Sequence, residues 1–209
     1  MCSYRRAEQL GALINRLKTL YPAAECTLEY AEDYQLLFNT RLAAQCTDAR
    51  VNIVKEELYA KFPTLEAIAN ADLAEMEAVV RPCGFYRTKA RDLIEGARLI
   101  LSDYSGRVPD TMEELLKIPG IGRKTANLVL GELYGQPAIV ADTHCIRLSN
   151  RLGLCNTTCP VKVESALKKL IPPTEQLHFC HRLVAHGRAV CRARKPECEK
   201  CGVREFCGF

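Results

Sequence analysis

The sequence predicts an all-α protein, and two observations carry that prediction. Apolar residues recur at three- and four-residue spacing through nearly the whole chain, as on the buried face of a helix. No stretch alternates apolar and polar residues for long, and none shows a strand–turn–strand pattern. The 209 residues are enough to bury a real core, either as one large domain or as two small lobes.

The expected helices follow from this spacing, and several carry a residue that begins or ends them. Pro22 ends the first, because proline cannot continue a helix. Asp48 is a candidate cap for the second, Asp72 with Glu75 forms a capping-box-like pair for the third, and a similar pair begins at Asp110. The spans expected to be helical are, in chain order, 10–20, 51–58, 72 to about 82–84, 90–101, a short helix after 110, 143–152, 160–170 and 174–186.

Charge and hydropathy restrict where the protein works. The chain has 29 basic and 25 acidic residues, a net charge of +4, which leans toward a polyanionic partner but decides nothing alone. No apolar run approaches the roughly 20 residues of a membrane span, and the N-terminus lacks a signal-peptide core. We therefore expect a cytoplasmic, nucleoid-associated protein with no membrane contact, or a nuclear one in a cell that has a nucleus.

The tail from Arg188 onward is dense in cysteine and short of long apolar side chains, so something other than a core must hold it. Cys191, Cys198, Cys201 and Cys207 follow the spacing C-x6-C-x2-C-x5-C. Four thiolates in 17 residues can surround one metal centre, which would supply folding free energy on the order of 10 kcal/mol. Zinc and an iron–sulfur cluster both accept four thiolates, and the spacing alone leaves the choice open.

The chain holds twelve cysteines in all, which is many for a protein without an export signal. A disulfide framework belongs to short secreted chains, so we interpret the remaining thiols as structural or incidental. These eight are Cys2, Cys26, Cys46, Cys83, Cys145, Cys155, Cys159 and Cys180.

A basic loop lies between the first two of the four clustered cysteines. It contains Arg192, Arg194 and Lys195, and residues 188–209 together hold six basic and three acidic side chains, a net +3. A thiolate-ligated cluster would offset most of that charge, so these side chains are useful only if they project away from the centre. The alternatives are a phosphate contact and a solvated surface loop, and the hairpin described next favours phosphate.

The stretch "LKIPGIGRKTANLVL" places a glycine-rich turn directly before a helix. Gly120 and Gly122 permit positive φ and leave no side chain to block a ligand. Between two helices, such a hairpin presents its backbone amides and the next helix N-terminus together, which binds phosphate without reading sequence. A plain helix–turn–helix connection is the alternative, but the longer pattern from Asp110 through "RKTA" is more demanding than a lone GxG.

Lys124 and Asp142 are the candidate catalytic residues. Lys124 lies in the first turn of the helix after the hairpin, where the helix dipole disfavours a cation and so favours the neutral, nucleophilic amine. Asp142, in "VADTHC", stands at the start of another helix. It is a preferred N-cap type, and a cap can still offer an oxygen to a substrate.

Three separated motifs resemble a known family at this point. "LKIPGIGRKTANLVL", "VADTHCIRLSNRLGL" and the C-x6-C-x2-C-x5-C tail together look like endonuclease III, a base-excision-repair glycosylase family of the helix-hairpin-helix superfamily. "AAQCTDARVN" and "CGFYRTKA" also resemble segments of that family, so the similarity runs nearly end to end.

The resemblance implies a fold, a cofactor and a partner. The family fold has two all-α lobes, which here are a hairpin-bearing helical module at 26–136 and a second lobe made of 1–25 plus 137–209. The second lobe carries a [4Fe–4S] cluster. Double-stranded DNA with a damaged base or abasic site lies across both lobes, and the damaged base is flipped into the cleft between them. We expect a monomer.

The resemblance also implies residue roles. Lys124 matches the family's nucleophile, Asp142 its catalytic aspartate, and the four tail cysteines its cluster ligands. Gln45 matches a residue that fills the gap left by the flipped base, and Phe85 stands where a leucine wedge is expected, a larger aromatic in its place. The remaining residues expected to contact DNA are Gly120, Gly122, Arg123, Arg192, Arg194 and Lys195, and Asp48 and His144 are candidate cleft residues.

The function implied is that of a bifunctional glycosylase and abasic-site lyase that removes oxidised pyrimidines and cuts 3′ to the site by β-elimination through a lysine Schiff base. The adenine-mispair branch of the superfamily lacks the lysine and carries an added C-terminal domain, whereas this chain has Lys124 and ends two residues past Cys207. The alternative that this chain is a relative specialised for pyrimidine dimers stays open. A non-catalytic DNA-binding module is disfavoured, because it needs neither Lys124 nor Asp142.

Overall fold

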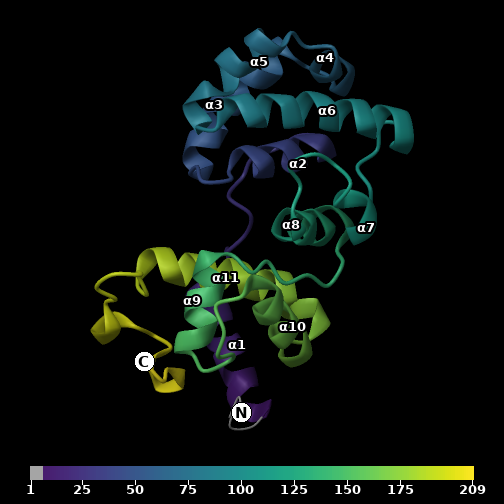
Figure 1. The fold of residues 1–209 in the computed structure, drawn as a ribbon. Helices are drawn as coiled ribbons and strands as arrows, with labels where there is room; N and C mark the ends of the chain where they lie inside the picture. The colour runs from purple at the N-terminus through teal and green to yellow at the C-terminus, as the bar shows by residue number, and fades with distance from the viewer. Residues whose placement is uncertain (1–6) are drawn as a thin grey trace. The chain divides into compact units, whose positions relative to one another are not determined.

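The computed structural model describes residues 7–209, and within that range every regular element is a helix (Figure 1). This confirms the all-α class. The chain divides into two compact units, Cys26–Tyr134 and a second unit that joins the chain before residue 26 to Gly135–Phe209. Cys2 lies outside the described residues.

The Cys26–Tyr134 unit is built around one long helix. Figure 1 shows α6 running between the α4–α5 pair and α2, and α8 packs against α2 and α7. Their apolar faces share one core. The elements are α2 (Asp33–Leu42), α3 (Asp48–Lys61), α4 (Leu65–Ala69), α5 (Leu73–Val80), the 3-10 turn η1 (Arg81–Cys83), α6 (Tyr86–Tyr104), α7 (Met112–Leu115) and α8 (Arg123–Tyr134).

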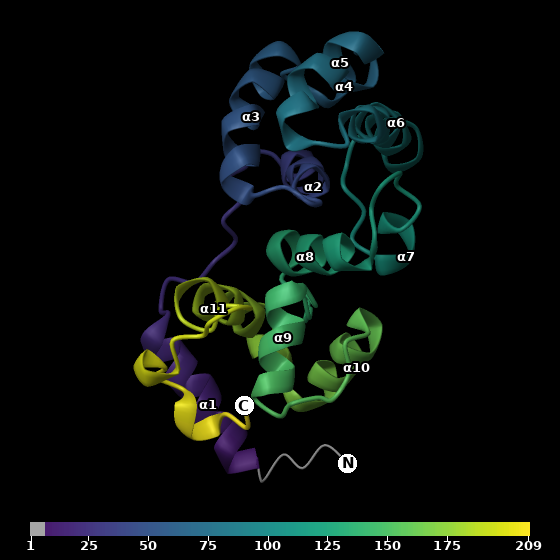
Figure 2. The same ribbon diagram turned by 60° about the vertical axis from the view of Figure 1, so that its left-hand side comes forward.

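The other unit packs its helices around α11. Contacts of α11 with α1 and with α9 form its centre, and the C-terminal tail folds back beside α1 (Figure 2). Arg16 on α1 donates a hydrogen bond to the Gly202 carbonyl at 2.9 Å, which fastens the tail there. The elements are α1 (Ala7–Leu20), α9 (Thr143–Arg151), α10 (Pro160–Leu170), η2 (Pro173–Glu175), α11 (Gln176–Ala189), η3 (Cys198–Lys200) and η4 (Arg204–Phe206).

Two helices, α2 and α4, escape detection by apolar spacing. Helix α4 has five residues, too few to show a period. Helix α2 is buried almost all round, so its sequence has no polar face to reveal it. Its buried polar groups are satisfied within the unit: the Asn39 amide donates to the Glu29 carbonyl at 2.9 Å and the Thr40 hydroxyl to the Leu36 carbonyl at 2.7 Å.

Two predicted caps are wrong by one residue. Thr47, not Asp48, caps α3, and its side chain accepts a hydrogen bond from the Arg50 amide at 3.2 Å. Thr111, not Asp110, caps α7. In each case a threonine next to the aspartate takes the position, because hydroxyl and carboxylate oxygens both satisfy helix N-terminal amides. Asp72 is confirmed as the cap of α5, with the Glu75 amide 3.0 Å from its carboxylate.

None of the helices within residues 7–209 combines the length and the apolar character needed to cross a membrane.

Candidate functional site

The turn between α7 and α8 is a tight hairpin with a specific requirement for glycine at one position. The Ile121 amide donates to the Ile118 carbonyl at 3.1 Å, and Gly120 adopts φ +73° inside this turn. The side chains of Ile118 and Ile121 are buried, so the hairpin is anchored in the core of its unit. Proline followed by glycine is the sequence that such a turn prefers, since the third residue needs positive φ.

Space as well as φ excludes a side chain at Gly120. A Cβ there would overlap the Arg41 side chain and the Asp92 carboxylate. These two residues form a largely buried ion pair, with Nε 2.7 Å and one terminal nitrogen 2.6 Å from the same Asp92 oxygen. The hairpin therefore rests on an ion pair that joins α2 to α6.

Gly122 differs from Gly120. It is exposed, it does not adopt positive φ, and a Cβ built on it meets nothing within 4 Å. Its carbonyl accepts the Ala126 amide at 2.9 Å, which begins the hydrogen bonding of α8. The absent side chain leaves the backbone next to the α8 N-terminus open to a ligand.

Lys124 and Arg123 begin α8, and both side chains are exposed. The opposite face of α8, with Ala126 and Val129, is fully buried and holds the helix in the core. The amine of Lys124 thus stands on a fixed backbone, two residues past the open Gly122.

Asp142 is the N-cap of α9, as the sequence predicted. Its Oδ1 accepts a hydrogen bond from the Cys145 amide at 2.6 Å. The buried side chains of Cys145 and Leu148 hold α9 against α11. The cap hydrogen bond uses one carboxylate oxygen and fixes the orientation of the side chain. The second oxygen takes no part in that hydrogen bond.

Gln45 and Phe85 share an uncommon backbone conformation. Both are non-glycine residues with positive φ, +54° and +50°, a conformation that L side chains rarely adopt. Phe85 keeps 65% of its surface exposed, which is unusual for an aromatic residue in a folded domain. Both line a cavity of about 180 Å³, so the structure brings together two residues that are 40 positions apart in the sequence.

A buried lysine that sequence analysis missed lies beside them. Lys89 lines the same cavity and is fully buried, and its amine donates to the carbonyls of Leu42 and Cys83, each at 2.8 Å. Desolvation on burial lowers the pKa of this amine, an effect opposed by the nearby thiols of Cys83 and Cys46. The lysine in "CGFYRTKA", on the apolar side of a helix pattern, was the available signal.

The four tail cysteines line one cavity of about 290 Å³. Burial raises the pKa of the Cys201 thiol, and the other three cysteines add to the effect because their thiolates would repel its own. Among residues 7–209, no three His, Cys, Asp or Glu side chains converge as ligands of one single metal ion would. All eleven described cysteines are free thiols.

Two further side chains reach the sulfur atoms of this cysteine cavity. Arg151 donates to the Cys191 sulfur at 3.2 Å, and a ring nitrogen of His186 lies 3.4 Å from the Cys201 sulfur. The other His186 ring nitrogen is 2.8 Å from the Tyr21 hydroxyl. Burial lowers the pKa of His186. Nitrogen groups beside thiolate sulfurs are typical surroundings of a thiolate-ligated centre, because hydrogen bonds to the sulfurs offset its negative charge.

The basic loop of the tail is exposed, but its three basic side chains are not equally available to a phosphate ligand. Arg192 forms an ion pair with Glu197 at 3.4 Å, while Arg194 and Lys195 are exposed and Lys195 has φ +54°. Arg151 also donates to the Arg192 carbonyl at 2.9 Å, so the loop backbone is held in place.

The two residues predicted to line the cleft have contacts inside their own units. Asp48 accepts a hydrogen bond from the Thr27 hydroxyl at 2.5 Å. His144 packs on Gly187 of α11, where a Cβ would overlap its ring, and its Nδ1 is 3.2 Å from a terminal nitrogen of Arg147. These contacts account for their positions.

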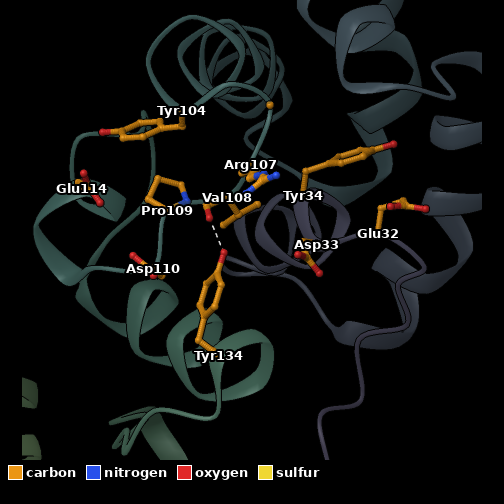
Figure 3. Close-up of a pocket in the computed structure, with 11 residues that line it drawn as sticks. Glu32, Asp33, Tyr34, Tyr104, Arg107, Val108, Pro109, Asp110, Glu114 and Tyr134 are labelled. Carbon is orange, nitrogen blue, oxygen red and sulfur yellow. Dashed lines mark hydrogen bonds between the residues drawn. The ribbon is translucent and has the colours of Figure 1, made fainter.

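A wider cavity of about 550 Å³ lies in the Cys26–Tyr134 unit, where α2, α6, α7 and α8 meet (Figure 3). Its lining includes four carboxylates against one arginine, and three tyrosines. The Tyr134 hydroxyl points to the Val108 carbonyl and donates to it. This acidic lining disfavours phosphate, and none of the predicted catalytic, DNA-contact or cluster residues belongs to it.

Known proteins that share the hairpin-bearing region and nearly the whole chain were found by comparison. The family described as "HhH-GPD superfamily base excision DNA repair protein" matches residues 39–173. Endonuclease III of Synechocystis sp. is 46% identical over 192 residues, covering 91% of this chain and 88% of the relative. Endonuclease III of Bacillus subtilis is 37% identical over 201 residues, covering 96% and 92%.

Solved structures agree in fold over the whole chain. A non-covalent endonuclease III–DNA complex and a trapped covalent endonuclease III–DNA intermediate each superpose with a TM-score of 0.92 at 37% identity, and they cover 97% of this chain. The chain covers 95% and 96% of those two structures. Since the family match spans more than half of the sequence and the relatives align along nearly all of it, this chain belongs to the HhH-GPD superfamily of base excision DNA repair proteins and, within it, to the endonuclease III family.

Proposed function

We propose that Lys124 and Asp142 carry the chemistry of this enzyme, a bifunctional DNA glycosylase and abasic-site lyase that removes oxidised pyrimidines from duplex DNA. One observation carries the assignment: an exposed lysine amine stands in the first turn of α8, directly after a hairpin whose Gly122 leaves the backbone open. A phosphate held by that backbone would bring the adjoining sugar within reach of the amine.

Lys124 supplies the nucleophile. The neutral amine attacks C1′ of the damaged nucleotide, a C1′–N bond forms, and the bond to the base breaks so that the base leaves with the electron pair and takes up a proton. The ring opens to a Schiff base between Lys124 and the sugar. Loss of a C2′ proton then expels the 3′ phosphate, and water releases the lysine.

Asp142 supplies negative charge and proton transfer. As the base departs, positive charge develops on the sugar, and a carboxylate stabilises it. The α9 cap holds one Asp142 oxygen on the Cys145 amide at 2.6 Å, so the carboxylate needs no reorganisation at the moment of reaction. The second oxygen can accept and return the protons that the Schiff-base steps require.

Gln45 and Phe85 open the duplex in this proposal. A damaged base must leave the stack to be attacked, and unstacking costs a few kcal/mol. An exposed aromatic ring at Phe85 can enter the stack, and the Gln45 amide can occupy the vacated space with its hydrogen-bonding groups. Their shared cavity supports a joint role.

The tail cysteines fit a [4Fe–4S] cluster. All four line one cavity of about 290 Å³, so four thiolates share a common space, as the ligands of such a cluster do. Cys191, Cys198, Cys201 and Cys207 would be its ligands. When bound, such a cluster crosslinks a segment that lacks a core of its own. Arg151 donates to the Cys191 sulfur, a His186 ring nitrogen lies beside the Cys201 sulfur, and the exposed Arg194 and Lys195 are then available to DNA phosphate.

The substrate partner in this proposal is double-stranded DNA with a damaged base or an abasic site, bound by a monomer in the nucleoid. Endonuclease III appears in complex with DNA in the similar structures, one of them a trapped covalent intermediate. A covalent enzyme–DNA intermediate is what attack by the Lys124 amine requires.

Borohydride trapping tests the reaction and its substrate in one experiment. Duplexes carrying one thymine glycol, one uracil, one pyrimidine dimer or one A·8-oxoguanine mispair are incubated with enzyme and borohydride. We expect a covalent product and a 3′ cut with thymine glycol and little with the others. Trapping confined to the dimer duplex would instead assign the chain to dimer repair, and cleavage without trapping would rule out the lysine mechanism.

A further inference from the structure

Lys89 is buried in a way that is rare for lysine. Its side chain has no solvent exposure, and both of its carbonyl contacts, to Leu42 and Cys83, are 2.8 Å long. A lysine that is fully removed from water loses hydration free energy, so its neighbours must compensate. An apolar side chain at this position would donate to neither carbonyl.

The two carbonyls come from two different helix ends. Leu42 is the last residue of α2, and Cys83 is the last residue of η1. Carbonyls at a helix C-terminus lack intrahelical partners and carry partial negative charge, so a cation is favourable there. One amine on α6 therefore joins two segments that are about 40 residues apart in the chain.

Each of these segments leads directly into one of the left-handed residues. Gln45 follows Leu42 by three positions, and Phe85 follows Cys83 by two. A left-handed non-glycine residue persists only where the surrounding structure determines it. The Lys89 amide donates to the Phe85 carbonyl at 3.0 Å as the first hydrogen bond of α6, so the lysine side chain starts from the same helical turn that follows Phe85.

Lys89, Gln45 and Phe85 line one cavity of about 180 Å³. We propose that Lys89 is a positioning residue that locks the Gln45 and Phe85 segments into one unit, so that the two side chains enter the duplex together. This inference rests on the proposed function, because it assumes that both side chains act on DNA.

Lys89→Met removes the two hydrogen bonds and nearly preserves the volume of the side chain. The matched control is Arg98→Met on the same helix, which removes a hydrogen bond of 2.8 Å to the Ala69 carbonyl at the end of α4, away from the two segments. Single-turnover excision of thymine glycol is measured for each variant in duplex and in single-stranded DNA, with thermal unfolding recorded for both.

We expect Lys89→Met to lose between about tenfold and a hundredfold of duplex excision, because misplaced Gln45 and Phe85 side chains would enter the duplex less well. Single-strand excision should change by less than about threefold, because a single strand does not need to be opened. Arg98→Met should leave the ratio of duplex to single-strand activity unchanged. Equal losses on both substrates, or the same ratio shift in Arg98→Met, would overturn the positioning role and leave Lys89 as a stability residue.

A double-mutant cycle keeps the inference testable if Lys89→Met does not fold. Gln45→Ala and Phe85→Ala are made singly and together in the otherwise unchanged enzyme, and binding to a duplex is read from the fluorescence of 2-aminopurine placed opposite the lesion. Locked segments should give non-additive effects, whereas independent ones add. Additive effects would overturn the proposal. If the unmodified enzyme forms no covalent product with borohydride and damaged DNA, the proposed function itself is wrong. The two failures are therefore distinguishable.

Discussion

Arg41 and Asp92 form an ion pair directly beneath Gly120, with both guanidinium contacts at 2.6–2.7 Å on one carboxylate oxygen. Arg41 lies on α2 and Asp92 on α6, so the hairpin rests on two helices distant in sequence. The same Arg41 also lines the cavity of Gln45, Phe85 and Lys89. The hairpin and the two left-handed segments are thereby supported by one set of side chains within one unit.

This relationship predicts different outcomes at the two hairpin glycines. Gly120→Ala forces a Cβ into the Arg41–Asp92 pair at φ +73°, and it should lower the free energy of unfolding by about 1–3 kcal/mol. Gly122→Ala should cost less than about 1 kcal/mol, because its Cβ meets open space. It should still weaken DNA binding by placing a methyl group where phosphate approaches. Urea unfolding and a binding titration check both, and equal destabilisation would contradict the role of the ion pair.

The roles proposed for Lys124 and Asp142 can be tested separately. Lys124→Gln removes the amine but keeps the hairpin and Asp142, so duplex binding should survive while borohydride trapping disappears. Asp142→Asn keeps the amine and removes only the charge that stabilises the cationic sugar, so it should lose most base excision. A preformed abasic site already presents an aldehyde, and trapping there should persist in Asp142→Asn. Trapping by Lys124→Gln would show that another amine is the nucleophile.

The tail loop is tested through salt dependence. Arg194→Gln should weaken binding to damaged and undamaged DNA alike, and the slope of log K against log salt should become shallower by about one unit. Arg192→Gln should have a smaller effect, since Arg192 is already paired with Glu197 at 3.4 Å. Arg107→Gln, in the acidic cavity of Figure 3, is the control and should leave the slope unchanged. An unaltered slope in Arg194→Gln would show that the loop is a solvated surface loop that does not contact phosphate.

Phe85 is tested by the difference between duplex and single strand. Phe85→Ala should lose activity on duplex lesions and much less on single-stranded ones, because only the duplex carries an unstacking cost of a few kcal/mol. Phe85→Leu keeps an apolar wedge and should retain most duplex activity. Parallel losses on both substrates would mean that the exposed ring only packs against its own unit.

The cysteine cavity predicts an absorbing cofactor. Freshly purified protein should show broad absorption at about 400 nm from thiolate-to-iron charge transfer. Cys198→Ser should lower that absorption and impair folding or DNA binding more than chemistry, whereas Cys159→Ser, an exposed thiol outside the cavity, should change neither. A colourless, fully active protein with stoichiometric zinc would refute the cluster.

Much of the helical structure could be read from local sequence. Helices α9 and α10 begin where the spacing predicts, Asp72 and Asp142 are caps, and the hairpin leads into α8 with Lys124 in its first turn. These features depend on residues three or four positions apart, which a sequence displays directly. The caps predicted at Asp48 and Asp110 were each one residue off, since the preceding or following threonine offers an oxygen that satisfies the same amides.

Local sequence is enough to predict the helical class, the glycine-rich hairpin, the lysine and aspartate that open two helices, and four cysteines at ligand spacing. Three features are visible only in the folded chain: α2 is a helix, Arg41 and Asp92 lie beneath Gly120, and Lys89 joins the ends of α2 and η1. The difference lies in the range of the interactions. A helix period is written within a few residues, whereas a buried ion pair or a lysine between two carbonyls exists only after distant segments have packed, and no local pattern records which partners will meet.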